Sequence, residues 1–155
     1  MTTFTLIHVL ISLIGIASGL VVLQGLCTSK RMDGWTLLFL STTVATSITG
    51  FMFPFNGLTP ALGVGALSMI ILAAAILARY RFKLVGSWRW IYVVSAVIAL
   101  YFNSFVLVVQ SFLKIPALHA LAPQGNEPPF AIAQGILLIL FVLACFKAVK
   151  RFHPA

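Results

Sequence analysis

Residues 6–26 read LIHVLISLIGIASGLVVLQGL, an apolar run without an acidic residue, a lysine or an arginine. A transmembrane helix needs about 20 mainly apolar residues to cross about 30 Å of hydrocarbon, so this run predicts one membrane span. The residues before it carry no positive charge of the kind that begins a secretory signal peptide. We therefore expect the helix to be retained in the protein.

The same pattern recurs along the chain between clear turn signals. Of the 155 residues, 61% are hydrophobic and 8% are charged, and the mean hydropathy is +1.12. In soluble domains about 25% of residues are charged, so lipid must be the solvent here. The apolar runs predict one all-α transmembrane domain over residues 1–155, a polytopic membrane bundle of five helices near 6–26, 35–55, 62–78, 90–112 and 130–149.

Basic residues are concentrated at alternate ends of the predicted helices. Cytoplasmic loops of membrane proteins carry an excess of Lys and Arg. If the turn at 28–34 is cytoplasmic, nine of the ten Lys and Arg residues fall on that side: Lys30, Arg31, Arg79, Arg81, Lys83, Arg89, Lys147, Lys150 and Arg151. This bias predicts an outside N-terminus and a cytoplasmic C-terminus. The formal charge of +8 then reflects topology and anionic lipid headgroups, so we expect membrane lipids and no nucleic acid as partners.

One face of the first predicted helix carries small residues. Ser12, Gly15 and Gly19 follow His8 at helical spacing, and Gly15 to Gly19 forms a GxxxG pattern. Such a pattern lets two helix backbones approach closely. We expect helix packing along this face, either inside the bundle or between copies of the chain.

Polar side chains from several helices reach the outer leaflet under this topology. Amide and imidazole groups inside a membrane need hydrogen-bond partners, so we expect them to face the interior of the bundle. Convergent polar groups among apolar ones are typical of a ligand pocket. We predict an outer-leaflet pocket for a small lipophilic or weakly polar ligand, lined by His8, Thr49, Asn103, Gln110 and Gln134. The alternative is a polar cap whose side chains only hold the helices together.

The longest predicted connection is the outer loop over residues 114–129. It contains Lys114, His119 and Glu127, and Glu127 is one of only two acidic residues in the chain. Long loops in compact domains are often functional. The loop is predicted either to cover the pocket as a lid or to serve as a solvated connector.

The sequence offers little for catalysis or metal binding. The histidines are widely separated and both cysteines lie near the cytoplasmic side, so no metal site is predicted. The two acids, Asp33 and Glu127, fall on opposite sides of the membrane, which excludes a catalytic pair of carboxylates. We predict no cofactor, and a haem held between His8 and His119 on the outer side stays an alternative.

The chain also resembles a known family through three segments. These are ALYFNSFVLVVQSF at 99–112, KIPALHALAP at 114–123 with EPPF at 127–130, and TGFMFPF at 49–55. They are similar to a family of small bacterial inner-membrane proteins to which no activity is assigned. The resemblance implies a multi-pass protein of the bacterial inner membrane and supplies no catalytic residues.

Three function classes follow, in order of preference. The first is a non-enzymatic protein that binds or passes a small ligand through the outer-leaflet pocket. The second is an accessory or structural subunit that docks a membrane protein partner, or a further copy of itself. The third is a membrane enzyme with a bound cofactor. A pocket protein should contain a cavity in its outer half, whereas a subunit should present small or polar residues to lipid.

Overall fold

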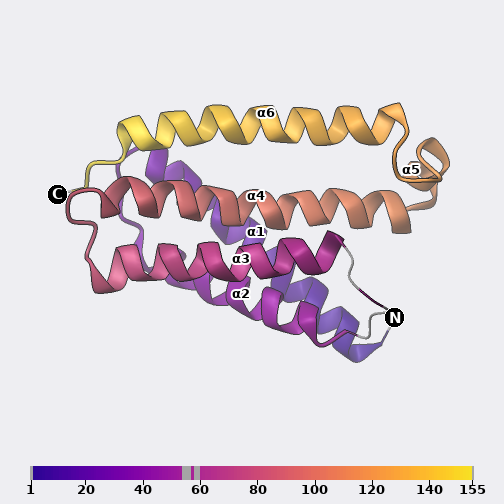
Figure 1. The fold of residues 1–155 in the computed structure, drawn as a ribbon, viewed down its shortest axis with the longest axis horizontal. Coiled ribbons are helices and arrows are strands. Elements are labelled where there is room, and N and C mark those ends of the chain that lie inside the picture. The colour runs from indigo at the N-terminus through magenta and orange to yellow at the C-terminus, as the bar shows by residue number, and fades with distance from the viewer. Residues whose placement is uncertain (1, 54–56, 58–59, 155) are drawn as a thin grey trace.

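The computed structural model describes residues 2–53, 57 and 60–154, and every regular element in this part of the chain is helical. Figure 1 shows long helices lying side by side, with a short helix at one end. The elements are α1 (Thr3–Cys27), α2 (Asp33–Phe51), α3 (Pro60–Ile76), the π-helical turn η1 (Leu77–Arg81) that continues α3, α4 (Trp88–Lys114), α5 (Pro116–Leu121) and α6 (Pro128–Arg151).

Four helical segments in the described residues are long and apolar enough to cross a membrane: Thr3–Cys27, Leu62–Arg81, Trp88–Lys114 and Pro128–Arg151. The chain therefore has the architecture of an integral membrane protein with four candidate spans. The remaining long helix, α2, has 19 residues, but seven of them are Ser or Thr and reduce its hydropathy. A fifth span through α2 and the orientation of the bundle stay predictions.

The helix boundaries differ from the prediction in three places. α2 ends at Phe51, where the N–H of Met52 bonds the Thr49 carbonyl, and the predicted continuation over 54–55 lies outside the described residues. α3 is prolonged by η1 to Arg81, although the apolar run stops near residue 78. The outer loop contains α5, which begins at Pro116, a favoured first helical residue because its missing N–H would have no partner there.

The two ends of the bundle are packed differently. In Figure 1 the N- and C-termini lie at opposite ends, and α1 and α2 diverge from α4 towards the N-terminal end. The main cluster of buried hydrophobic residues lies in the other half of the bundle, where the α1–α2 turn, η1 and the C-terminal segment meet: Val22, Leu26, Phe39, Leu40, Leu72, Ala75, Ala78, Tyr92, Val93, Ala96, Val97, Ala99, Leu100, Ala148 and Phe152. We call this half the closed end and the other the open end.

The two glycines of the GxxxG pattern lie where α1 meets its neighbours. A Cβ on Gly19 would come within 2.5 Å of the Leu100 side chain and 2.9 Å of Phe39. A Cβ on Gly15 would come within 3.3 to 3.4 Å of side chains on α2 and α4. These glycines allow α1 to approach α2 and α4 within this chain. Ser12 lies further towards the open end and lines a cavity instead.

Candidate functional site

A cavity of about 630 Å³ lies between α1, α2, α3 and α4 in the open end. Ligand pockets commonly have volumes of roughly 300–1,000 Å³ and apolar walls with a few polar groups. The apolar wall includes Phe51, Phe53 and Phe102, and the polar lining consists of Thr5, His8, Ser12, Thr46, Ser47, Ser68, Asn103, Gln110, Ser111 and Lys114. None of the described lining residues is acidic. The cavity therefore suits a mainly apolar ligand that carries hydrogen-bonding groups but no positive charge.

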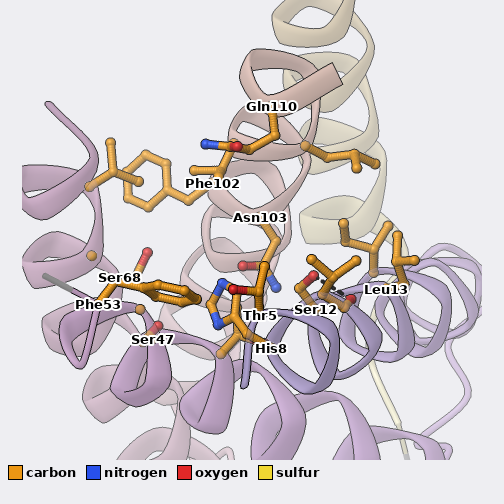
Figure 2. A pocket seen from close by; sticks show the side chains of 18 of the residues that line it. Thr5, His8, Ser12, Leu13, Ser47, Phe53, Ser68, Phe102, Asn103 and Gln110 are labelled. Carbon is orange, nitrogen blue, oxygen red and sulfur yellow. Dashed lines mark hydrogen bonds between the residues drawn. The ribbon is translucent and has the colours of Figure 1, made fainter. Parts of the chain in front are cut away.

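The first helix supplies one polar edge of this cavity. Thr5, His8 and Ser12 are spaced by three and four residues, so they lie on one face of α1. Figure 2 shows these side chains beneath the Asn103 amide, which points towards them from α4. The hydroxyl of Ser12 donates to the carbonyl of Val9 at 2.7 Å, so its own donor is already used. The free hydrogen-bonding capacity of this edge comes mainly from His8.

The imidazole of His8 is oriented by α2. Its Nδ1 lies 2.6 Å from the Thr49 hydroxyl, and that hydroxyl donates its single proton to the carbonyl of Ala45 at 2.7 Å. When the hydroxyl donates to that carbonyl it accepts from the Nδ1–H group, and in this tautomer of the neutral imidazole Nε2 is an acceptor. The ring also packs edge-on against Phe53, with centroids 5.0 Å apart. Since no described residue bonds Nε2, His8 offers the cavity a hydrogen-bond acceptor.

Asn103 provides the complementary group from α4. Its Nδ2 is buried and has no hydrogen-bond partner among the described residues. A buried donor without a partner costs about 1–3 kcal/mol. The amide lines the cavity beside α1, since a Cβ on Gly15 would lie 3.4 Å from Nδ2. An acceptor atom on a bound ligand would remove this cost.

The remaining side chains of α4 extend the lining towards the end of the bundle. Gln110 and Lys114 follow Asn103 on the same face at intervals of seven and four residues, and both line the cavity. Ser111 also lines it but donates to the carbonyl of Leu107 at 2.7 Å. Gln110 is half-buried and Lys114 is exposed. The polar lining on α4 thus continues from Asn103 to the C-terminal end of that helix.

The hydroxyl groups of α2 are mostly satisfied by their own helix. Thr46 donates to the carbonyl of Thr42 at 2.8 Å, and Thr42 donates to the carbonyl of Leu38 at 2.6 Å. Such bonds let a helix rich in Ser and Thr lie among apolar neighbours. The hydroxyls of Thr42 and Thr46 therefore need no ligand, although Thr46 lines the cavity together with Ser47. The buried Thr43 hydroxyl has no hydrogen-bond partner among the described residues.

The structure brings three of the five predicted pocket residues, His8, Asn103 and Gln110, around this cavity. Thr49 does not line it and instead holds His8. Gln134 lies elsewhere, because its Nε2 donates to the carbonyl of Phe105 at 3.3 Å between α4 and α6. Gln134 was predicted at the same level along the membrane normal as the pocket, but its side chain contacts Phe105 of α4 and not the cavity.

The outer loop does not form the predicted lid in this structure. Of its residues, only Lys114 and Ile115 line the cavity. The His119 ring contacts the carbonyl of Phe112 at 3.3 Å, so α5 is folded back on the end of α4. The predicted loop group of Lys114, His119 and Glu127 is therefore not assembled around the cavity, and a haem between His8 and His119 gains no support from this placement.

Glu127 organises the loop itself. Its carboxylate accepts from the backbone N–H groups of Gln124 at 2.9 Å and Asn126 at 3.2 Å. Slight desolvation of the carboxyl raises its pKa, but these backbone hydrogen bonds outweigh that effect, and the pKa of Glu127 lies below its usual value. Glu127 is a structural residue of the loop in this arrangement.

Several lining residues were missed by sequence reasoning. Thr5 lies one turn before His8, and the same helical spacing could have found it. Ser68 is buried in α3 and is its only hydroxyl residue between Pro60 and Ile76. Nothing in the sequence distinguishes Phe51 and Phe102 from other phenylalanines, because an aromatic residue is found equally on faces towards a cavity and faces towards lipid.

Comparisons with known proteins add no assignment to this geometry. No protein-family model matches the chain, and neither a curated protein nor a solved structure gives a match. The resemblance described above stays an expectation. Within the described residues, no group of three or more His, Cys, Asp or Glu side chains is placed to hold a metal ion.

Proposed function

We propose that the protein binds, or passes, a small lipophilic or weakly polar ligand in the cavity between α1 and α4, in the outer leaflet of a bacterial inner membrane. The observation that carries this proposal is the pair of unused groups in the cavity. The Asn103 Nδ2 is a buried donor without a partner, and the Nε2 of His8 is an acceptor. A ligand with an apolar body and one hydroxyl group would match both, because the hydroxyl oxygen accepts from Nδ2 and the hydroxyl proton is donated to Nε2.

The proposal includes five spans with an outside N-terminus. α2 lies along α1, and its 19 residues would extend about 28 Å at a rise of about 1.5 Å per residue. Counting α2, an odd number of long helices agrees with termini at opposite ends of the bundle (Figure 1). The closed end, where the α1–α2 turn, η1 and the C-terminal segment meet, carries nine of the ten Lys and Arg residues, and Lys114 is at the open end. This distribution supports a cytoplasmic location for the closed end.

Native mass spectrometry of the protein extracted gently from its own membrane, with an absorbance spectrum of the same sample, tests the proposal. We expect a retained small molecule on the wild-type chain. Val106→Trp places a large ring at the cavity wall and should abolish retention. Ile139→Trp is the matched control, because Ile139 is exposed on α6 and does not line the cavity.

Equal retention by both variants would contradict binding in this cavity. An empty wild-type cavity together with co-purifying protein chains would instead favour an accessory subunit. A haem absorbance band would move the assignment to a cofactor-bearing protein. Each result distinguishes one function class from the others.

A further inference from the structure

A second, smaller cavity of about 270 Å³ lies at the closed end of the bundle. Its described lining residues are Arg31, Lys83, Leu84, Arg89, His153 and Pro154, and none of them is acidic. They come from four separate segments of the chain: the α1–α2 turn, the turn after η1, the first turn of α4 and the C-terminal segment. We call this cavity the basic cleft.

The walls of the basic cleft are held by specific contacts. The Nη1 of Arg89 donates to the carbonyls of Val149 at 2.9 Å and Phe152 at 2.8 Å, which ties the start of α4 to the end of α6. The N–H of His153 donates to the Ser29 hydroxyl at 2.9 Å. Phe152 is fully buried and packs against Tyr92, with the two ring centroids 6.0 Å apart. These bonds place Arg89 and His153 in the cleft.

The positive charge at the closed end exceeds the available negative charge. Asp33 is the nearby carboxylate, and it accepts from the Nε of Arg31 at 3.3 Å and from the buried Arg79 at 2.5 Å. The other acidic residue of the chain, Glu127, lies in the loop before α6, at the opposite end of that helix. Among the described residues, no carboxylate is bonded to Lys83 or Arg89. Like charges confined in one cleft repel each other, and a bound anion removes that repulsion.

The turn that carries Lys83 is also unusual. Lys83 and Leu84 have φ values of 53° and 63°, in the left-handed region that residues other than glycine rarely adopt. Two successive residues in this conformation bring Lys83 and Leu84 to the wall of the cleft. Backbone strain of this kind is concentrated at ligand sites.

We propose that the basic cleft binds a phosphate group through Arg31, Lys83 and Arg89. Arginine side chains bind phosphate oxygens with two parallel N–H donors, and a lysine adds a point charge. Leu84 and Pro154 give the cleft an apolar side against which an acyl chain or glycerol could lie. The phosphate would come either from the headgroup of an anionic lipid or from free phosphate. This inference is independent of the ligand in the open end.

Binding to the full-length chain in phosphate-free detergent micelles tests the proposal. The probes are phosphatidylglycerol, inorganic phosphate and, as a lipid without phosphate, diacylglycerol. Native mass spectrometry measures lipid affinity, and the midpoint of thermal unfolding measures stabilisation. The double variant Arg31→Gln with Lys83→Gln removes two cations from the cleft. Lys30→Gln with Lys150→Gln removes the same charge from residues outside the cleft.

We expect the cleft variant to bind phosphatidylglycerol at least about tenfold more weakly than the wild type, because charge-assisted hydrogen bonds are lost. The control variant should change the affinity less than about twofold, and diacylglycerol should bind all three equally. Stabilisation of the wild type by inorganic phosphate, lost in the cleft variant, would identify free phosphate as sufficient. Stabilisation by phosphatidylglycerol alone would identify the lipid headgroup.

Equal weakening in the cleft and control variants would overturn the proposal, since it would show attraction to positive charge in general. Unchanged affinity in the cleft variant would overturn it as well. The single variant Lys83→Gln provides a second test, because the Lys83 side chain has no hydrogen-bond or ion-pair partner in the described residues and its loss should leave the fold intact. It should weaken lipid binding in the same direction.

Discussion

The closed and open ends of the bundle use different residues for different purposes. The closed end is packed with small side chains, among them Ala75, Ala78, Ala99 and Ala148, each fully buried. The open end contains aromatic and polar side chains around a cavity of about 630 Å³. Small residues let helix backbones approach closely, and large side chains such as Tyr92 and Phe152 fill the remaining space in the closed end. The same helices thus form a rigid base at one end and a cavity at the other.

The largest expected effect comes from disturbing the contact at which α1 leaves the closed end. Gly19→Val should reduce the free energy of unfolding by about 3 kcal/mol, because the new side chain overlaps Leu100 and Phe39. Thermal or denaturant unfolding in detergent measures the change. Gly135→Val is the control, since nothing lies within 4 Å of a Cβ there. Similar stability of the two variants would contradict this account of α1 packing.

A smaller effect is expected from the ion pair at the closed end. Arg79 is buried with 3% of its surface exposed, lies on the π-helical turn η1, and has the Tyr92 ring 5.1 Å from its guanidinium carbon. Asp33→Asn would leave this cation without its carboxylate. We expect a loss of about 1–2 kcal/mol, less than the roughly 3–5 kcal/mol of fully buried pairs, because the Asp33 side chain is 71% exposed.

The same ion pair predicts a pH dependence. Slight desolvation raises the pKa of Asp33, but the hydrogen bond and charge of Arg79, together with Arg31, outweigh it and lower the pKa below 3.8. The stabilisation is therefore complete above pH 3.8 and is lost as the pH falls through the lower, folded-state pKa. The unfolding midpoints of the wild type and Asp33→Asn should converge in this acidic range. A constant difference between them would show that ionisation of Asp33 is not involved.

Ligand retention should depend on the Asn103 amide and not on the Gln134 amide. Asn103→Leu removes the unpartnered donor, so the empty protein should keep its stability while ligand retention falls about tenfold. Gln134→Leu changes an amide outside the cavity and should leave retention unchanged. Native mass spectrometry and thermal unfolding of both variants make the comparison. Equal retention by the two variants would place the ligand elsewhere.

The smallest effect concerns the orientation of His8. Thr49→Val removes the acceptor of the Nδ1–H group and should cost about 1 kcal/mol in the free energy of unfolding. Thr42→Val removes a hydroxyl bonded only to carbonyls of its own helix and should cost less. Thermal unfolding midpoints measured side by side would decide the matter. A larger loss in Thr42→Val would show that α2 depends on its internal hydroxyl bonds more than on His8.

Hydropathy and charge predict where a residue lies along the membrane normal but not which way it faces. His8, Asn103 and Gln110, which were predicted to share one pocket, line one cavity, whereas Gln134, at a similar predicted depth, contacts Phe105 instead. The rotation of each helix about its own axis depends on side-chain packing, which hydropathy and charge do not predict. The predicted helices correspond to the long helices of the structure, because runs of about 20 apolar residues have few other stable forms.

Two features could not be predicted in full from the sequence, although the spacing of Ile115, Leu118 and Leu121 is compatible with a short helix in the outer loop. The π-helical turn Leu77–Arg81 inserts Arg79 into the core, although a basic residue after an apolar run is ordinarily expected at the surface. The outer loop folds back on α4 because its residues 116–121 form α5, whose contacts with α4 depend on tertiary structure. Hydropathy predicts neither the π-helical turn nor the contact between α5 and α4.

The bonds from Arg89 to the end of α6 also have a consequence for the assembly of the chain during synthesis. Only 6% of the apolar window of α6 is buried, so this helix gains little from side-chain packing. Arg89 is translated long before Val149 and Phe152, the carbonyl partners that it binds. A nascent chain that has inserted α4 but not α6 lacks these two acceptors, so water must hydrogen-bond the Arg89 guanidinium. Docking of α6 replaces that water with the carbonyls of Val149 and Phe152, so the start of α4 and the end of α6 are joined only after both helices have been made.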